Sequence, residues 1–336
     1  MATPIVAIIG AGLTGLIAAR ELHSAGIPSV IFDKSRGVSG RMATRRVEYQ
    51  GATLRFDHGT AYLTQTQAKD IAQVLAPNDP VNGDTAWQHF RDAANLVPWH
   101  TQRNSGPTKF VSPTGINNVG KALAADLDVH LNTAVTQAHW HAENSKWQLV
   151  VQDSPLPTAF DLIVTTTPPV QAANILAKHQ GNVLSALLDR QPMACWTLML
   201  ATQEPLAETH QPEPGEIISR VIAETSKNRP FPENWHGYTV QADRNWSQRN
   251  VDLDADQVAA TLLQKLKEQG WRGMAIGHQR IHRWLYAGIA NPVSQPCLTD
   301  PQRRLICAGD WCVGNDLDSA LLSGRAAGRQ ALEFLD

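Results

Sequence analysis

Three glycines near the amino end have the spacing of a dinucleotide-binding loop. Gly10, Gly12 and Gly15 form a Gly-x-Gly-x-x-Gly motif. The first glycine of such a motif permits a tight turn, the second lets the backbone approach a pyrophosphate, and the third lets a helix pack closely on a strand. Further along the chain, Asp33 is placed to accept a hydrogen bond from a ribose hydroxyl. These residues predict dinucleotide binding without specifying which dinucleotide.

The elements that position these glycines must be a strand, a helix and a second strand. Apolar residues 5–9 predict the first strand, residues 18–22 belong to the helix, and residues 30–33 form the second strand, which ends in the acid. The amino end of the helix offers free N–H groups and a partial positive charge to the phosphates. The segment is therefore predicted to be the βαβ unit of a Rossmann-like domain.

Three further segments carry residue types that suit the same ligand. Gly37 and Gly40 let the chain pass close to a large molecule, and Arg41 can form charge-assisted hydrogen bonds with a pyrophosphate. Gly59, flanked by polar residues, suits a backbone that lies against a planar ring. Near the carboxyl end, Asp310 follows a strand and precedes a helix, so it can contact a sugar-like chain while the helix dipole points into the cleft.

Together these segments resemble the flavoprotein superfamily that contains the amine oxidases, and more narrowly the renalase family in its bacterial form. The runs His282-Arg-Trp-Leu-Tyr-Ala287 and Gly309-Asp-Trp-Cys312 are the most specific parts, and the resemblance extends over nearly the whole chain. It implies FAD as the cofactor, and because no cysteine has surroundings that favour a covalent link, non-covalent binding is expected. The residues implied to bind it are Gly10, Gly12, Leu13, Thr14, Gly15, Asp33, Lys34, Gly40, Arg41, Met42, His58, Gly59, Thr60, Val135, Asp310 and Ser319.

The resemblance also implies a reaction. Enzymes of that family oxidise isomeric dihydro-NAD(P), in its 2- or 6-dihydro forms, by hydride transfer to the flavin, and dioxygen then yields NAD(P)+ and hydrogen peroxide. Because aromatisation drives the transfer, no general base is required, and no catalytic side chain is assigned. Tyr62, Trp246, Trp284 and Tyr286 are candidates for shaping the pocket, with Trp311 and Cys312 near the flavin. For each tryptophan, ordinary core packing is an equal alternative.

Two positions depart from the family pattern, and other functions stay open. Ser39 stands where the family usually has a glycine, and residues 58–61 differ from its usual sequence. In the family these positions line the flavin and the substrate face, so the departures bear on the identity of the substrate more than on that of the cofactor. The main alternative is a flavin amine oxidase that acts on a free amine. A flavin-binding protein without turnover and an NAD-dependent dehydrogenase are the others.

The predicted fold class is α/β, with a discontinuous Rossmann-like FAD-binding domain and an inserted antiparallel-sheet α+β substrate domain. The first comprises residues 1–66, 115–170 and 300–336, and the second comprises 67–114 and 171–299. Hydrophobic periodicity predicts helices over 68–75, 117–127, 258–269 and 319–332. It predicts a hairpin of 134–140 with 146–152, and strands over 129–131, 160–164, 196–201, 280–287 and 304–308. Residues 87–110 are interpreted as a strand pair.

Bulk properties restrict the partners and the compartment. The net charge is −2 without a basic stripe, which argues against nucleic acid, so the arginines of 41–46 indicate local anion binding instead. No apolar run reaches the ~20 residues of a membrane span. The first strand starts near residue 4, which leaves no room for a signal peptide, so a cytoplasmic protein without membrane association is expected. Scattered cysteines and paired histidines lacking a third ligand predict neither disulfides nor a metal site.

Overall fold

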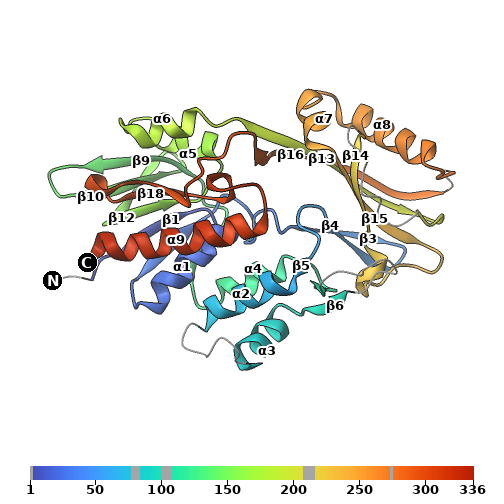
Figure 1. The fold of residues 1–336 in the computed structure, drawn as a ribbon, viewed down its shortest axis with the longest axis horizontal. Helices are drawn as coiled ribbons and strands as arrows, with labels where there is room; N and C mark the ends of the chain where they lie inside the picture. Colours follow the sequence, from blue (N-terminus) through green and yellow to red (C-terminus); the bar gives the residue numbers. More distant parts are fainter. Residues whose placement is uncertain (1–2, 77–83, 100–107, 207–215, 273–274) are drawn as a thin grey trace.

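The computed structural model describes residues 3–76, 84–99, 108–206, 216–272 and 275–336. Two groups of elements are visible in Figure 1: a parallel sheet with helices α1 and α9 on the left, and an antiparallel sheet with α7 and α8 on the right. Helices α2, α3 and α4 lie below the junction between them. No helix in these described ranges is long and apolar enough to cross a membrane.

The first group is built on a six-stranded sheet with the order β17-β18-β12-β1-β2-β8. Its pairings are parallel except for edge strand β17, which is antiparallel to β18. Every residue of the central strands is buried, as expected for a parallel sheet covered on both faces. The bounds are β1 Val6–Ile9, β2 Ser29–Phe32, β8 Asp128–His130, β12 Leu162–Thr165, β17 Cys297–Asp300 and β18 Leu305–Ala308.

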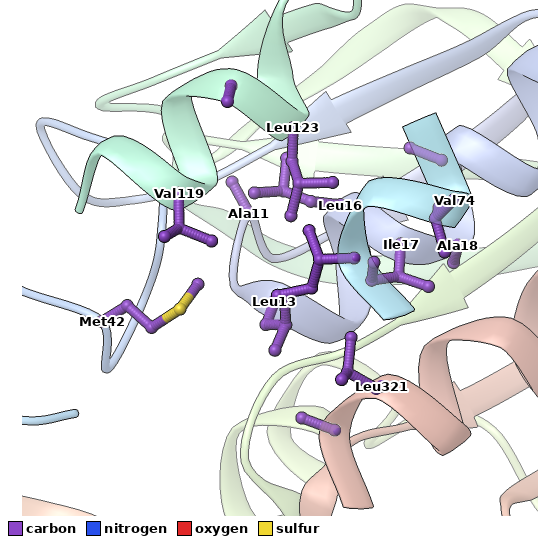
Figure 2. Packing of buried hydrophobic residues seen from close by; sticks show 14 of the residues in the cluster. Ala11, Leu13, Leu16, Ile17, Ala18, Met42, Val74, Val119, Leu123 and Leu321 are labelled. Carbon is purple, nitrogen blue, oxygen red and sulfur yellow. The ribbon is translucent and has the colours of Figure 1, made fainter. Parts of the chain in front are cut away.

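Helices α1 (Leu13–Ser24) and α9 (Leu317–Leu335) cross closely at a glycine. A Cβ atom on Gly324 would lie 2.7 Å from the carbonyl oxygen of Thr14, so a larger residue would force the helices apart. The Thr14 hydroxyl donates to the Ala320 carbonyl at 3.1 Å across the same crossing. Figure 2 shows α1 between α9, α2 (Gln65–Leu75) and α4 (Asn118–Ala124), where its leucines are buried.

The second group is a four-stranded antiparallel sheet with the order β14-β15-β13-β16. Its strands are β13 Pro192–Thr202, β14 Ile218–Ala223, β15 His236–Ala242 and β16 Ile276–Ile289. Helices α7 (Arg244–Arg249) and α8 (Ala255–Glu268) pack on it around a separate apolar core. The hairpin of β3 (Thr44–Tyr49) and β4 (Ala52–Asp57) joins this sheet to the Rossmann-like part.

Smaller elements complete the described chain. The remaining strands are β5 Leu63–Thr64, β6 Val97–Trp99, β7 Lys109–Val111, β9 Val135–His141, β10 Lys146–Val151 and β11 Ser154–Phe160. The remaining helices are α3 Asp84–Ala93, α5 Pro169–Ile175 and α6 Asn182–Leu188, with short 3-10 turns η1 Thr225–Lys227, η2 Pro301–Arg303 and η3 Asp310–Cys312.

The predicted fold class is confirmed, with two local corrections. Residues 87–110 are not simply a strand pair, because α3 precedes β6 and β7, and residues 100–107 lie outside the described ranges. Trp87, Phe90 and Ala94 have helical spacing and pack into the core around α1, so burial of one face favours the helix. The predicted hairpin β9–β10 gains a third strand, β11, that sequence periodicity missed.

Candidate functional site

The three glycines of the loop between β1 and α1 have distinct geometric roles. Gly10 has φ +112°, a conformation that L side chains rarely adopt. A Cβ atom on Gly15 would lie 2.0 Å from the Gly10 carbonyl oxygen, so the helix could not approach the strand with any other residue there. A Cβ atom on Gly12 would meet nothing within 4 Å. The backbone at Gly12 is therefore open to a ligand, as phosphate binding requires.

Asp33 braces this loop. The Ala11 N–H donates to its Oδ2 at 2.7 Å, and the Ser35 N–H donates to its Oδ1 at 2.7 Å. Its carbonyl accepts from the Thr133 N–H at 2.8 Å, which brings the start of β9, including the buried Val135, next to the end of β2. The carboxylate is half-exposed, and each oxygen keeps a lone pair that a ribose hydroxyl could use. Lys34 beside it is exposed.

Ser39 adopts a backbone conformation that normally requires glycine. Its φ is +95°, and its hydroxyl donates to the Asn117 carbonyl at 2.8 Å. A Cβ atom on Gly120 would lie 2.1 Å from the Ser39 Oγ, so helix α4 accommodates this side chain only because a glycine faces it. The next residues, Gly40 with φ +54° and the buried Met42, complete the turn against α4 (Figure 2).

Arg41 connects three of the predicted motifs. Its guanidinium Nη2 lies 2.5 Å from Asp310 Oδ1, and its Nη1 donates to the Ala287 carbonyl on β16 at 3.1 Å. Its own carbonyl accepts from the Thr60 N–H at 3.0 Å, and a Cβ atom on Gly59 would lie 1.9 Å from that carbonyl oxygen. The Arg41 side chain is 39% exposed, whereas Asp310 is 6% exposed. The arginine can therefore reach a ligand in solvent-accessible space.

The carboxyl-terminal motif contributes the amino end of α9. Asp316 caps this helix by accepting from the Ser319 N–H at 2.9 Å and from its hydroxyl at 2.6 Å. Ser319 is buried, and Gly314 donates its N–H to the Asp310 carbonyl at 2.8 Å. The helix dipole and Asp310 thus belong to one compact turn, as the sequence predicts.

A stack of aromatic rings lies beside Gly59. The His58 and Trp284 rings are stacked at 5.2 Å and 22°, and the Trp284 Nε1 donates to the His58 carbonyl at 2.9 Å. His282 meets both rings edge-on, at 4.9 Å and 4.5 Å. The Gln241 side chain donates to the Gly59 carbonyl at 2.7 Å. Gln241 was not predicted, and His282 was singled out only as part of a family-specific run. Together these contacts hold residues 58 and 59 against the antiparallel sheet.

Both histidines of the stack are neutral at pH 7. Burial first, then the charges of His282 and Arg45, lowers the pKa of His58 to about 4. Burial, then Arg45 and Arg280, lowers the pKa of His282 to about 4. Neutral imidazoles can accept or donate hydrogen bonds but cannot supply a positive charge.

Two of the other predicted pocket residues, Tyr62 and Trp246, pack elsewhere. Tyr62 packs against Trp99, with the Lys109 ammonium 4.5 Å from its ring, and Trp246 packs on the core beneath α8. Tyr286 lies on β16 two residues after Trp284.

Trp311 and Cys312 are buried in the core around β18, and burial raises the pKa of the Cys312 thiol. Of the four pocket candidates, Trp284 contacts two predicted cofactor residues, His58 and Gly59.

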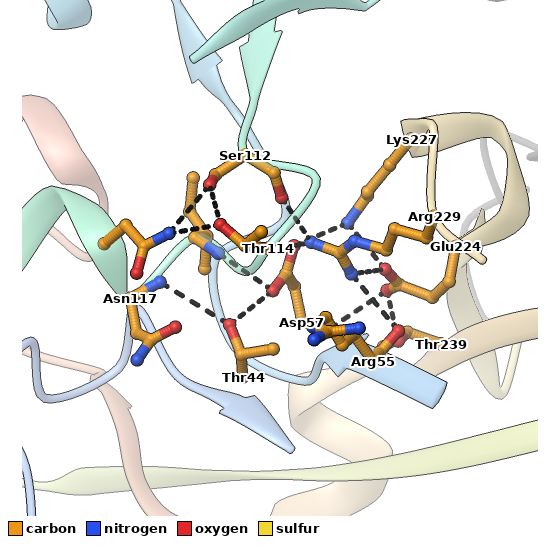
Figure 3. A network of polar contacts seen from close by, with 12 residues as sticks. Thr44, Arg55, Asp57, Ser112, Thr114, Asn117, Glu224, Lys227, Arg229 and Thr239 are labelled. Carbon is orange, nitrogen blue, oxygen red and sulfur yellow. Dashed lines mark hydrogen bonds and ion pairs between the residues drawn. The ribbon is translucent and has the colours of Figure 1, made fainter. Parts of the chain in front are cut away.

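A fully buried ionic network includes Asp57, the residue directly before His58 (Figure 3). This network was not predicted from the sequence. Asp57 on β4 accepts from Lys227 at 3.0 Å and from Arg229 at 2.5 Å, and both cations also contact Glu224. All four side chains are 0% exposed. Burial favours a raised pKa for Asp57, but Lys227 and Arg229 and its hydrogen bonds outweigh burial and lower the pKa.

The network has a balanced charge and further hydrogen bonds to neighbouring residues. Thr239 donates to Glu224 at 2.6 Å, Thr44 donates to Asp57 at 2.7 Å, and Arg229 donates to the Ser112 carbonyl at 2.9 Å. These contacts tie β4, β15 and the segment after β7 together. The local signal in the sequence was three charged residues between β14 and Pro230. No group of three or more metal-ligating side chains occurs within the described ranges.

Comparisons with known proteins agree with this architecture. Residues 8–76 match the family model of the NAD(P)-binding Rossmann-like domain. Over 121 residues, or 34% of the chain, the sequence is 33% identical to the "Putative flavin-containing monoamine oxidase AofH" of two Mycobacterium tuberculosis strains. That match spans only 24% of the length of those relatives.

Solved structures resemble the whole chain. The "Putative protoporphyrinogen oxidase" from Exiguobacterium sp. 255-15 has a TM-score of 0.70 at 13% identity, covering 99% of this chain and 100% of that one. An oxidoreductase from Methanosarcina mazei has a TM-score of 0.65 at 14% identity, covering 96% and 99%. A putrescine oxidase variant has a TM-score of 0.65 at 13% identity, covering 98% and 99%. The chain therefore has an NAD(P)-binding Rossmann-like domain within the fold that these oxidoreductases share.

Proposed function

We propose that this chain is an FAD-dependent oxidoreductase that holds its cofactor without a covalent bond. The carrying observation is the convergence of Arg41, Asp310 and Gly59 beside the open backbone of Gly12. Arg41 has two partners within the protein and keeps a solvent-accessible edge that could bind a pyrophosphate. The capped amino end of α9 could stabilise negative charge that develops on the flavin ring. When bound, FAD would supply a hydride acceptor that dioxygen can reoxidise.

We infer that the substrate is an isomeric dihydro-NAD(P), oxidised to NAD(P)+ with hydrogen peroxide as the second product. The sign of the charge around the ring stack supports this choice. Arg45 lowers the pKa of both His58 and His282, and Arg280 lowers that of His282, so the two arginines contribute positive charge beside the stack. A dinucleotide carries negative phosphates and is attracted, whereas a protonated amine would be repelled.

The residues of the stack would then position the substrate rather than react with it. Trp284 and Gln241 hold the carbonyls of His58 and Gly59 by hydrogen bonds, which makes the backbone at this point a rigid wall. The proposed oxidation removes a hydride and leaves an aromatic ring, so no side chain has to accept a proton from the donor. Rigid backbone beside two neutral imidazoles is consistent with a site that positions the substrate and accepts no proton from it.

The second candidate is oxidation of a free amine. Two comparisons favour it. The sequence is 33% identical to a putative flavin-containing monoamine oxidase over 121 residues, and the fold is similar to that of a putrescine oxidase. Its electrostatic requirement is opposite, because an amine binds as a cation unless the site lowers its pKa. The two candidates therefore predict different substrates for the same pocket.

Anaerobic flavin bleaching separates the candidates. The purified protein should show an oxidised-flavin spectrum, and isomerised NADH preparations should bleach it rapidly, whereas ordinary NADH and a panel of amines should not. Bleaching by an amine alone would establish the second candidate, and a protein unable to bind FAD would refute both.

A variant tests the cofactor site separately. Arg41→Ala should lose flavin on gel filtration while keeping the far-UV circular dichroism of the wild type, because its two contacts are beside the proposed pyrophosphate. Arg329→Ala, which removes an exposed arginine from α9, is the matched control and should retain flavin. Equal retention by both variants would contradict the role given to Arg41.

A further inference from the structure

Two arginines next to the ring stack have no partner of opposite charge among the residues that the structure describes. Arg45 lies on β3 and Arg280 on β16, and neither forms an ion pair or a side-chain hydrogen bond with another residue in the described part of the chain. Arg45 is half-buried, and its pKa is lowered by burial and then by the charges of Arg280 and Arg36. Arg280 is exposed, so water solvates its charge. Like charges held close together still repel one another, and an anion bound between them would relieve that repulsion.

Packing of the β3–β4 hairpin on β16 places the two arginines together. Tyr49 on β3 contacts β16, since a Cβ atom on Gly277 would lie 2.3 Å from its hydroxyl. Tyr49 and Arg45 point to the same face of β3, because side chains alternate along a strand. Arg45 therefore points toward β16, further along the same contact.

Arg280 faces the hairpin from the other side. It is paired with Met199 on β13, and Met199 packs against Phe56 of β4 in a small apolar cluster. Phe56 is itself directly opposite Arg45 across the β3–β4 pair, and it stacks on His278 at 5.6 Å. Both guanidinium groups thus belong to the junction between the hairpin and β16, on the side where His58 meets His282.

Buried polar atoms in this junction also lack partners. His58 is 6% exposed, and its Nδ1 has no hydrogen bond of ordinary geometry with another described residue, although the Phe56 carbonyl acts weakly on it. The Nε2 of His278 is buried and equally without a partner among the described residues. An unpaired buried polar atom costs about 1–3 kcal/mol, so a ligand that pairs with it gains affinity.

We propose that Arg45 and Arg280 form a phosphate-binding subsite, which holds the pyrophosphate of a dinucleotide substrate while its nicotinamide lies beside the His58–Trp284 stack. The inference rests on the proposed function and specifies how that substrate is recognised. Guanidinium groups suit it because they bind phosphate oxygens in pairs and stay charged at every physiological pH. The positive charge of Arg36 also reaches Arg45.

Ligand binding to the FAD-loaded protein tests the subsite without turnover. The probe is ADP-ribose, which carries the pyrophosphate but no nicotinamide, and its affinity is measured by isothermal titration calorimetry. Arg45→Met with Arg280→Met should weaken binding roughly tenfold or more, since each arginine gives charge-assisted hydrogen bonds. Affinity for the wild type should also fall as salt is raised.

The control removes the same charge from the same two strands. Arg46 and Arg283 are exposed and point to the opposite faces, where Arg46 approaches the Thr114 carbonyl and Arg283 donates to the Val251 carbonyl. Arg46→Met with Arg283→Met should change ADP-ribose affinity by no more than about twofold. Equal weakening by the two double variants, or no weakening by either, would overturn the subsite.

A conservative double variant distinguishes loss of phosphate recognition from loss of folding. Arg45→Lys with Arg280→Lys keeps the charges but removes the paired donors, so its affinity should lie between those of the wild type and the methionine variant. A lysine variant no tighter than the methionine variant would contradict phosphate recognition. If ADP-ribose binding depends on both arginines and isomerised NADH causes no bleaching, the anion site stands while the proposed oxidation fails.

Discussion

Removing one cation from the buried network is expected to destabilise the protein strongly. The Lys227 Nζ lies 3.0 Å from both Asp57 and Glu224, in a cluster of two cations and two anions that excludes solvent. Lys227→Met leaves two carboxylates facing Arg229 alone. Leaving an uncompensated buried charge costs about 3–5 kcal/mol. Because stabilities of about 5–15 kcal/mol are typical, this loss is a large fraction of the total.

Urea denaturation followed by tryptophan fluorescence measures the effect, with FAD at the same excess in every sample because a bound ligand adds stability. The free energy of unfolding should fall by about 3–5 kcal/mol for Lys227→Met. Lys265→Met is the control, since Lys265 pairs with Glu268 at 2.6 Å on the surface. Exposed pairs contribute about 0.2–1 kcal/mol, so the control should stay within that range.

A compensated variant separates charge balance from packing. Lys227→Met with Glu224→Gln restores neutrality, and the glutamine oxygen can still accept from Thr239 and from the Asp57 N–H. At least half of the lost stability should return. A loss below about 1 kcal/mol for Lys227→Met would refute the reasoning, because it would mean that the buried charges are solvated or dispensable. No recovery in the double variant would show that charge balance is not the cause.

Two further predictions concern the strained turn and the ring stack. Ser39→Gly should be more stable than Ser39→Ala by about 1 kcal/mol or more in the same assay, because only glycine relieves φ +95°; the reverse order would contradict backbone strain. For His58, with a pKa of about 4 when folded and about 6.5 when unfolded, the unfolded chain binds more protons between these values. Stability should therefore decline as pH falls from 6.5 to 4, by up to about 3 kcal/mol more than in His58→Gln. Parallel declines would exclude this linkage.

Local patterns predicted the nucleotide-binding part well because its determinants are close in sequence. A buried strand, glycines that permit a turn and a tight helix crossing, and a second strand ending in Asp33 all lie within residues 5–33. Each requirement is set by backbone conformation or hydrophobic period, so single residues report it. Helix α3 was missed because its apolar residues are few and interrupted by polar ones, and burial against α2 and α4 decided its structure.

The surroundings of the proposed substrate depend on contacts between segments that are far apart in sequence. His58 meets His282 and Trp284, and Asp57 meets Lys227, only because the β3–β4 hairpin packs on the antiparallel sheet. No spacing rule relates such residues, since strand pairing and charge compensation are properties of the folded chain. The amino-acid sequence specified the dinucleotide loop and its acid, while tertiary packing alone decided which charges are paired, which are left open and which rings form the wall of the site.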